Sequence, residues 1–384
     1  MKNYLLALIA VLILHGTSLA CTSAIVTAQR SSEGVPLLWK HRDNVNFTNT
    51  RVDYVTGGRY AYTAIVPNNK NYKKGVYAGI NEVGLGVMTT ATKNLPTATE
   101  EAYNACPRER LKMGASRTAL CECATLDEFE DILRNTKRRR GFCSNLGIAD
   151  ATGAVAYFEI WDLGYRRYDA TNRPDGFDVR ANFSHSRVKG KKAGVSKRRS
   201  DLIMKEMKAH KGLFTPQELM GYSRSYNSLK YGDVLALDKT YICENHTVPR
   251  YSTVGAFVMV CDGKNPRMLV INGHSVSGLA VPVYVHAKRN IPQCVRGNSM
   301  RLLSKEFVKK AYCEIADNIR ILNKDLVRNV LKIKQPKIDM PKEMPSDIKA
   351  FNENIDKQFA KYEQRVRKVL DKSEPTYSFS VITR

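Results

Sequence analysis

Cys21 is the residue whose type and position promise chemistry, because it stands where a leader segment would be cleaved. The surrounding stretch reads "HGTSLACTSAIV", residues 15–26. A cysteine at such a place can receive a lipid, pair in a disulfide, or act as a nucleophile that cleavage exposes. A lipid anchor usually has an aliphatic residue three places earlier, where this chain has Ser18. A disulfide at the frayed first residue of a mature chain would constrain little. All three fates stay open.

The nucleophile hypothesis has a definite mechanism, since a cysteine that begins a chain carries a thiol and a free α-amino group together. An α-amine has a reference pKa of about 8, well below that of lysine. It can be neutral near neutral pH, take the thiol proton and later return it to a leaving amine. No histidine is required, and His41, His185 and His274 are scattered in unfamiliar contexts.

The segment before Cys21 has the composition of a secretory signal peptide. It starts with Lys2, continues with the apolar run "YLLALIAVLIL", which is too short to span a bilayer comfortably, and ends with small residues at Ser18 and Ala20. We therefore predict a signal peptide over residues 1–20 and an exported protein, periplasmic or secreted. The less favoured alternative is a non-catalytic exported binding protein that is anchored by a lipid on Cys21. No later run is apolar and long enough for an integral membrane segment.

Six short motifs follow one another over residues 21–280: "CTSAIV", "LLWKHRDN", "AGINEVGLGV", "ADATGAVAYFEI", "VRANFSHSR" and "TVGAFVMV". Together they resemble the choloylglycine hydrolase, penicillin V acylase and acyl-CoA:6-aminopenicillanate acyltransferase branch of the N-terminal nucleophile hydrolases. That branch also includes acid ceramidase-like amidases. The resemblance implies cleavage of a linear amide C–N bond through a thioester on Cys21, or acyl transfer from the same intermediate. It also implies an αββα four-layer sandwich.

The resemblance assigns the catalytic groups near Cys21. Asp43 matches the aspartate that ends the second strand and holds the α-amino group. Bile salt hydrolases and ceramidases carry an arginine three places before that aspartate, where this chain has Lys40, while Arg42 is adjacent to Asp43. Either cation could lie beside the thiolate. Lysine offers a single charged ammonium rather than the paired N–H donors of arginine. We therefore do not expect a bidentate contact with the substrate at that place.

Asn182, in "RANFSHS", matches the asparagine whose amide donates to the oxyanion of the tetrahedral intermediate. Its alternative is a turn or glycosylation asparagine, because "NFS" is also a sequon. An oxyanion donor would have to be buried and unmodified.

Three further residues are candidates for contacts with the substrate or oxyanion. Bile salt hydrolases carry another asparagine after the "NE-GL" hairpin, and the matching stretch here, "MTTATKN", puts Thr90 or a neighbour at that place, where a backbone N–H could substitute. Arg199 resembles an arginine of ceramidase-like members, and Arg250 lies roughly where bile salt hydrolases have another. Ordinary surface arginines are the alternative for both.

The pattern of strands and helices predicts an α+β fold with mostly antiparallel hairpins. Strand patterns flank a helical middle, and Thr125 with Glu128 begins one helix with a capping box. We expect a catalytic domain over residues 21–300 and a helical extension over residues 301–384. Residues 302–333 read as helix.

The last part of the extension has apolar residues at helical spacing. Their face should pack on the parent domain or on a second subunit, so a homo-oligomer is possible. These residues are Ile348, Phe351, Ile355, Phe359, Tyr362, Val366 and Val369.

The composition of the chain limits the kinds of binding partner to expect. The net charge of +24 suits either an anionic partner or a solvated basic surface, and no nucleic-acid-binding motif is present. The chain has nine cysteines, and "CEC" at Cys121 and Cys123 lacks a second pair at metal spacing. We therefore expect no metal, no cofactor and no nucleic acid. The resemblance, in turn, implies a small-molecule acyl amide as substrate: a bile-salt-like, a penicillin V-like or another N-acyl amide.

Overall fold

The computed structural model describes the chain from Cys21 to Ser373 with several gaps. The described residues are 21–44, 50–68, 75–92, 94–95, 99–105, 111, 114–137, 139–140, 143–186, 194–237, 241–242, 246–316 and 319–373. The predicted signal peptide lies outside them.

One antiparallel sheet of six strands contains the residues that follow Cys21. Cys21 directly precedes β1, which pairs with β2 on one side and β10 on the other. Both faces of the central strands are buried, which explains apolar runs such as "TVGAFVMV". In spatial order the strands are β10 (Phe177–Ala181), β1 (Thr22–Val26), β2 (Leu37–Asp43), β14 (Thr253–Val260), β15 (Arg267–Ile271) and β16 (Val281–Tyr284).

A second sheet of seven strands is an antiparallel meander, in which each strand pairs with the next along the chain. The tight β5–β6 turn depends on Gly84, whose φ of 88° favours glycine, and on Asn81, whose Oδ1 accepts from Leu85 N at 2.8 Å. The strands are β3 (Thr50–Val55), β4 (Tyr62–Pro67), β5 (Ala78–Asn81), β6 (Gly86–Ala91), β7 (Ser144–Ala149), β8 (Val155–Trp161) and β9 (Gly164–Asp169).

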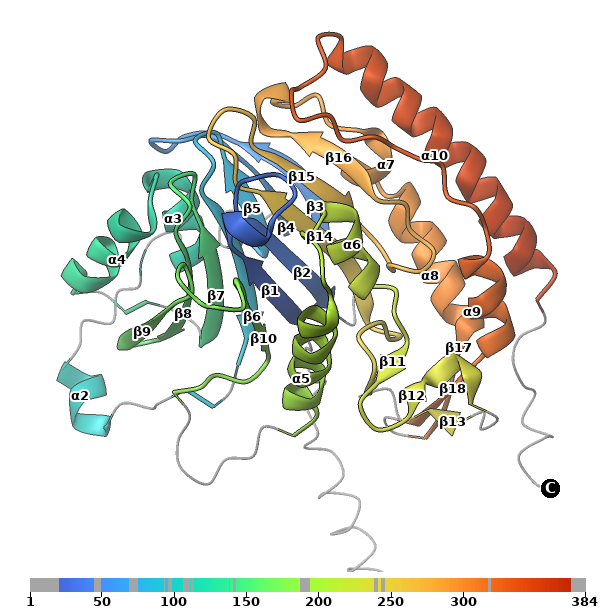
Figure 1. Cartoon of the computed structure of the whole chain (residues 1–384), viewed down its shortest axis with the longest axis horizontal. Coiled ribbons are helices and arrows are strands. Elements are labelled where there is room, and N and C mark those ends of the chain that lie inside the picture. Colours follow the sequence, from blue (N-terminus) through green and yellow to red (C-terminus); the bar gives the residue numbers. More distant parts are fainter. Residues whose placement is uncertain are drawn as a thin grey trace, which may run out of the picture.

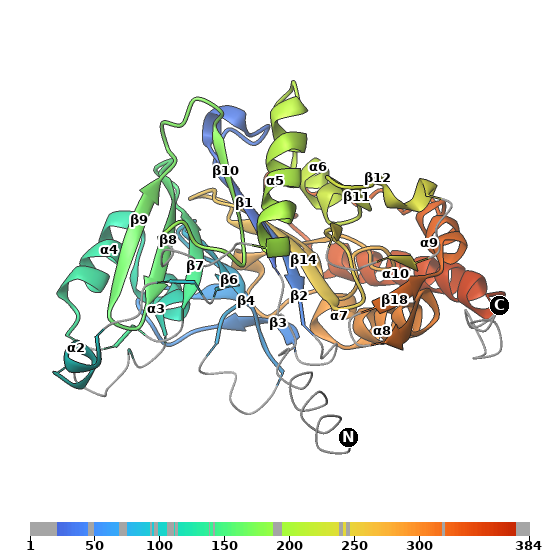
Figure 2. The ribbon, with the colours of Figure 1, turned by 90° about the horizontal axis from the view of Figure 1, so that it is seen from below.

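The two sheets face each other, and helices cover their outer faces (Figures 1 and 2). α3 and α4 cover the seven-stranded sheet, and α5 and α6 cover the six-stranded sheet. The predicted αββα sandwich is thus confirmed. The predicted cap of α4 is present as well, because Thr125 Oγ1 accepts from Glu128 N at 3.2 Å. The helices are α3 (Ala115–Glu122), α4 (Leu126–Asn135), α5 (Gly194–Ala209) and α6 (Pro216–Tyr222); α2 (Glu100–Ala105) lies before them in the chain.

The segment predicted as one helix over residues 302–333 is interrupted by a hairpin, so that prediction was wrong in its middle. β17 pairs with β18, and β18 pairs with β13, so these residues form a three-stranded sheet. Alternating aromatic and β-branched residues, such as Tyr312, Ile319 and Ile321, suit strands once such a partner is available. The elements are α8 (Ser299–Ala311), β17 (Tyr312–Ala316), β18 (Ile319–Leu322) and α9 (Lys324–Leu331), with β13 (Tyr241–Ile242) and the short pair β11 (Asn227–Ser228) and β12 (Gly232–Asp233).

The last helix, α10 (Ile348–Asp371), packs on α7 (Gln293–Arg296), α8 and α9 of the same chain (Figure 1). Its carboxylate Asp356 accepts from the backbone nitrogens of Gln293 and Cys294, both at 2.9 Å. Among the described residues, every helix is too short or too polar to traverse a bilayer. The buried face of α10 comprises Asn352, Ile355, Phe359, Tyr362, Val366 and Leu370.

Replacing Phe359 tests whether α10 is an integral part of the domain. Phe359→Ala should lower the free energy of unfolding by about 3–5 kcal/mol, as expected when a buried aromatic ring is truncated. Urea unfolding measures this change. Lys361→Ala, on the exposed face of the same helix, is the control and should change it by about 0.5 kcal/mol or less. A Phe359→Ala protein as stable as the control would contradict this packing.

Candidate functional site

Cys21 lies in a cavity of about 330 Å³ near the end of β2. Its side chain is nearly buried, with 7% of the residue surface exposed. Residues from β2, β6 and the segment before β5 line the same cavity, so both sheets contribute. The lining residues are Cys21, Lys40, Arg42, Asp43, Asn44, Gly75, Val76, Tyr77, Thr89 and Ala91.

The backbone nitrogen of Cys21 is held by the side chain of Asn182, which follows β10. This nitrogen donates to Asn182 Oδ1 at 2.5 Å, and Arg199 Nη2 donates to the same oxygen at 3.1 Å. Because both neighbours are donors, the amide oxygen must face them. Asn182 Nδ2 points the other way and donates to Ala91 O at 2.6 Å. An amide NH₂ has two protons, so one remains for a further acceptor.

Strand β2 sends its polar residues to two sides, because successive side chains of a strand point to opposite faces. Lys40 and Arg42 face the seven-stranded sheet. There, Lys40 Nζ donates to Thr89 O, and Arg42 Cζ lies 3.9 Å from the ring centroid of Tyr77. His41 turns the other way and lies 3.1 Å from the hydroxyl of Thr253 on β14. A single strand therefore contributes to the cavity and to the structure behind it.

Burial sets the ionisation of Lys40. It lowers the pKa of this ammonium from 10.5 to about 8, with the positive charge of Arg42 acting in the same direction. The carboxylate of Asp43, and a thiolate at Cys21, oppose the shift. Lys40 is thus mostly protonated at neutral pH and becomes neutral in mildly alkaline solution.

Asp43 is buried at the end of β2 and stays ionised. Burial by itself would raise its pKa, but the charge of Arg250 and a hydrogen bond with His41 outweigh burial and lower the pKa. Arg250 Nε lies 3.2 Å from Asp43 Oδ2, and His41 Nε2 lies 3.2 Å from Oδ1. The hydroxyl of Thr253 also donates to Oδ1, at 3.0 Å.

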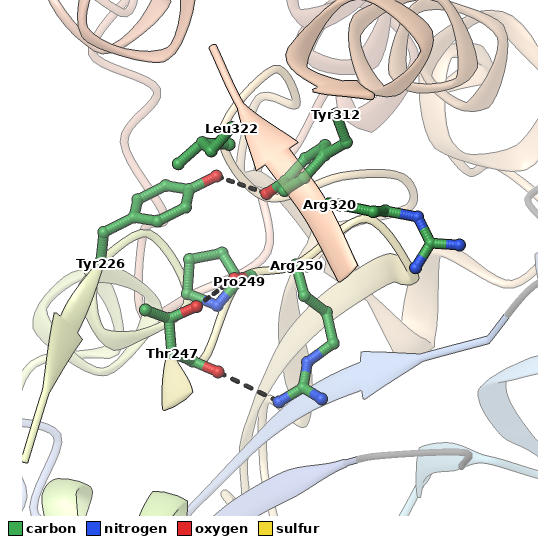
Figure 3. Close-up of a pocket in the computed structure, with 7 residues that line it drawn as sticks. All are labelled: Tyr226, Thr247, Pro249, Arg250, Tyr312, Arg320 and Leu322. Atoms are coloured by element: carbon green, nitrogen blue, oxygen red, sulfur yellow. Dashed lines mark hydrogen bonds between the residues drawn. The ribbon is translucent and has the colours of Figure 1, made fainter. Parts of the chain in front are cut away.

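Residues of the C-terminal extension lie near Arg250, where they line a small pocket together with it (Figure 3). Its Nη2 donates to Thr247 O at 3.0 Å, and its carbonyl oxygen lies 3.0 Å from His274 Nε2. Tyr312, from β17, shares a 2.6 Å hydrogen bond with the hydroxyl of Tyr226 and lies 3.5 Å from the same His274 nitrogen. Burial lowers the pKa of His274 to about 3, so this imidazole is neutral.

The structure brings most of the predicted site residues together. Cys21, Lys40, Arg42 and Asp43 line one cavity. Asn182 Oδ1 accepts from the nitrogen of Cys21 and from Arg199, and Arg250 pairs with Asp43. Their chemical roles remain predictions.

Thr90 lies away from the cavity, which its neighbours Thr89 and Ala91 line. Its hydroxyl donates to Ala181 O at 3.4 Å, just before Asn182. Asn145 Nδ2 donates to the same carbonyl at 2.9 Å. These two side chains support the strand end from which Asn182 projects.

Sequence reasoning missed Asn145, Tyr77 and the contact of His41 with Asp43. The position of His41, two residues before Asp43 on a predicted strand, could have indicated a shared face. Asn145 and Tyr77 come from distant strands and had no such signal.

Three of the other described thiols do not line this cavity. Cys261 and Cys294 lie in the core, where burial raises the pKa of each thiol. Burial likewise raises the pKa of Cys123 to about 12. Within the described ranges, no three histidine, cysteine or acidic residues are grouped so that they could bind a metal ion.

No family model and no curated protein matches this sequence. Among solved structures, a mutant conjugated bile acid hydrolase from Clostridium perfringens is similar at 12% identity and a TM-score of 0.44, over 70% of this chain and 93% of that one. Penicillin V acylase from Agrobacterium tumefaciens is similar at 13% identity and a TM-score of 0.41, over 69% and 86%.

A Caenorhabditis elegans ortholog of N-acylethanolamine-hydrolyzing acid amidase is similar at 19% identity and a TM-score of 0.39, over 62% of this chain and 92% of that one. These three proteins are of the kinds that the sequence motifs resemble. The likeness to all three is distant.

The buried ammonium of Lys40 should make stability depend on pH. Between about pH 8 and pH 10 the unfolded chain keeps this proton and the folded chain loses it. The contribution of Lys40 to the free energy of unfolding should therefore rise with pH, by at most about 1.4 kcal/mol per unit.

Urea unfolding of wild type and Lys40→Met at pH 7, 8, 9 and 10 measures that contribution as a difference, in which other titrating groups cancel. The wild type should gain stability relative to Lys40→Met as the pH rises. Lys361→Met, on the exposed face of α10, should show no such trend. A difference that is independent of pH would show that Lys40 is not buried as a cation.

Proposed function

We propose that this chain is an exported cysteine amidohydrolase in which cleavage before Cys21 creates the nucleophile and its base together. The observation that carries this proposal is the placement of Cys21. Its side chain lies in a cavity beside Lys40 and Arg42, while its nitrogen is fixed by Asn182 Oδ1. Removal of residues 1–20 would turn that nitrogen into an α-amine in a defined position.

The first half of the reaction would form a thioester. The α-amine donates one proton to Asn182 Oδ1, which orients its lone pair, and accepts the proton of the Cys21 thiol. The thiolate attacks the amide carbonyl carbon, and the carbonyl oxygen becomes an oxyanion. When the C–N bond breaks, the ammonium returns its proton to the leaving amine.

Two groups are suited to stabilise the oxyanion. Asn182 Nδ2 has one proton left after its bond to Ala91 O, and the ammonium of Lys40 interacts electrostatically with Cys21. A preorganised donor at such a place is worth about 3–4 kcal/mol of transition-state stabilisation. Asp43 would act less directly, because its charge raises the pKa of Lys40 against the effect of burial.

The second half would release the acid. Water attacks the thioester carbonyl, the C–S bond breaks, and the thiol regains its proton from the α-ammonium that removed a proton from the water. An amine in place of water would give acyl transfer by the same intermediate. Adding hydroxylamine and measuring the hydroxamate formed reports how readily an amine competes.

Substitution of Cys21 is the first test. Cys21→Ala should lower the hydrolysis of a responsive acyl amide by about a thousandfold or more, because no nucleophile remains. Wild type is screened on a conjugated bile salt, an N-acylethanolamine, an N-acylglycine and phenoxyacetyl amides. Cys143→Ser, a free thiol of another region, is the control and should retain activity.

Intact mass and N-terminal sequencing of the mature protein accompany this assay. A chain that begins with unmodified Cys21 supports the proposal. A diacylglyceryl group on Cys21 would instead identify a lipid-anchored protein, and full activity in Cys21→Ala would refute the mechanism.

The α-amine also predicts a pH profile. The rate constant kcat/KM should fall below about pH 7, because a protonated α-amine cannot accept the thiol proton. The profile is measured from pH 4 to pH 9 on the best substrate. A rate that stays flat down to about pH 4 would exclude the α-amine as the base.

A further inference from the structure

Arg42 carries a buried guanidinium in the cavity. Among the described residues, no carboxylate forms an ion pair with this group. The residue is 3% exposed and lines the cavity beside Cys21. Its Nη1 has no hydrogen-bond partner among the described residues. Asp43 is the carboxylate in the lining, and its two oxygens already lie 3.2 Å from His41 and Arg250.

The charges of the lining therefore favour an anionic ligand. The lining contains two cations, Lys40 and Arg42. Its one carboxylate, Asp43, is paired with Arg250, which lies outside the lining. Both cations are buried, so their charges are poorly solvated, and this burial lowers the pKa of each. A buried cation that forms no ion pair among the described residues is costly, and a bound anion would offset that cost.

The geometry of Arg42 suits a carboxylate. Its guanidinium carbon lies 3.9 Å from the centroid of the Tyr77 ring, so the aromatic face fixes the group by a cation–π contact. When an aromatic ring packs against the face of a guanidinium, the N–H groups at the edge of the guanidinium can still donate. Two of these N–H groups match the two oxygens of a carboxylate. Lys40 is less available, since its ammonium donates to Thr89 O.

The strand register places this carboxylate receptor next to the nucleophile. β1 and β2 pair Ser23 with Lys40 and Thr22 with His41. Continuing this register by one residue places Cys21 opposite Arg42. Residues directly opposite each other in an antiparallel pair have Cα atoms about 4.5–5.5 Å apart. A carboxylate on Arg42 would thus lie within a few bonds of the carbon that Cys21 attacks.

We propose that the site takes linear amides that carry a carboxylate within a few bonds of the scissile C–N bond, and that Arg42 binds this carboxylate. The inference rests on the proposed function and narrows its substrate class. The carboxylate can belong to the amine half, as in an N-acyl amino acid, or to the acyl half, as in the monoamide of a dicarboxylic acid.

Matched substrates test the inference and distinguish the two halves. N-decanoylglycine is compared with N-decanoylglycinamide, and N-butylsuccinamic acid with its neutral counterpart N-butylpentanamide. In at least one pair, wild type should hydrolyse the acid with a kcat/KM at least about tenfold higher, as expected of hydrogen bonds to a charged group. The pair that shows this preference identifies the half that carries the carboxylate.

Arg42→Met should reduce the ratio of the two kcat/KM values to about one, and Arg42→Lys should restore part of it. The ratio is measured within one preparation, so it does not depend on the folded fraction. Arg134→Met, on the exposed surface of α4, is the control and should keep the wild-type ratio. Equal rates on acid and neutral substrates in wild type, or an unchanged preference in Arg42→Met, would overturn the inference.

A binding measurement separates failure of this inference from failure of the proposed function. If wild type hydrolyses none of the four amides, the proposed function fails for this substrate class. Calorimetry on Cys21→Ala then compares binding of N-decanoylglycine and N-decanoylglycinamide without turnover. Tighter binding of the acid that disappears in Cys21→Ala/Arg42→Met supports Arg42 as the receptor, and equal or undetectable binding of both ligands refutes it.

Discussion

The buried carboxylate of Asp43 is the constraint around which the site is arranged. An ionised group at this depth requires several partners at once, and it has Arg250, His41 and Thr253. Removing one partner of a buried ion pair typically costs about 3–5 kcal/mol, so these groups must be fixed together. These contacts therefore tie the end of β2 to the segment before β14 and to strand β14 itself.

This requirement draws the C-terminal extension into the site. Arg250 can pair with Asp43 only while its backbone is fixed, and its carbonyl oxygen lies 3.0 Å from the neutral imidazole of His274. The hydroxyl of Tyr312, in the hairpin of the extension, lies 3.5 Å from that imidazole. The same hydroxyl shares a hydrogen bond with Tyr226 (Figure 3). The extension is thus part of the support for the carboxylate rather than an appendage with separate packing.

The sequence predicted those parts of the structure that depend on local pattern. Cys21, Asp43 and Asn182 could be found because each adjoins or ends a strand with a recognisable motif. The pairing of Arg250 with Asp43 spans about two hundred residues and follows from the sheet order β2–β14, which periodicity does not specify. The β17–β18 hairpin was read as helix because strand propensity depends on partners, here β13, that a single sequence does not reveal.

The orientation of Asn182 shows the same limit at the scale of one side chain. The motif predicts an amide that donates to an oxyanion, whereas its oxygen faces the nitrogen of Cys21 and one N–H is taken by Ala91 O. Both tasks are compatible, because an amide has two protons on nitrogen and an oxygen that accepts. One face of β2 therefore secures a fixed negative charge, while the other presents cations beside the nucleophile. This division lets a single strand combine rigidity with an unsatisfied positive charge that a substrate can use.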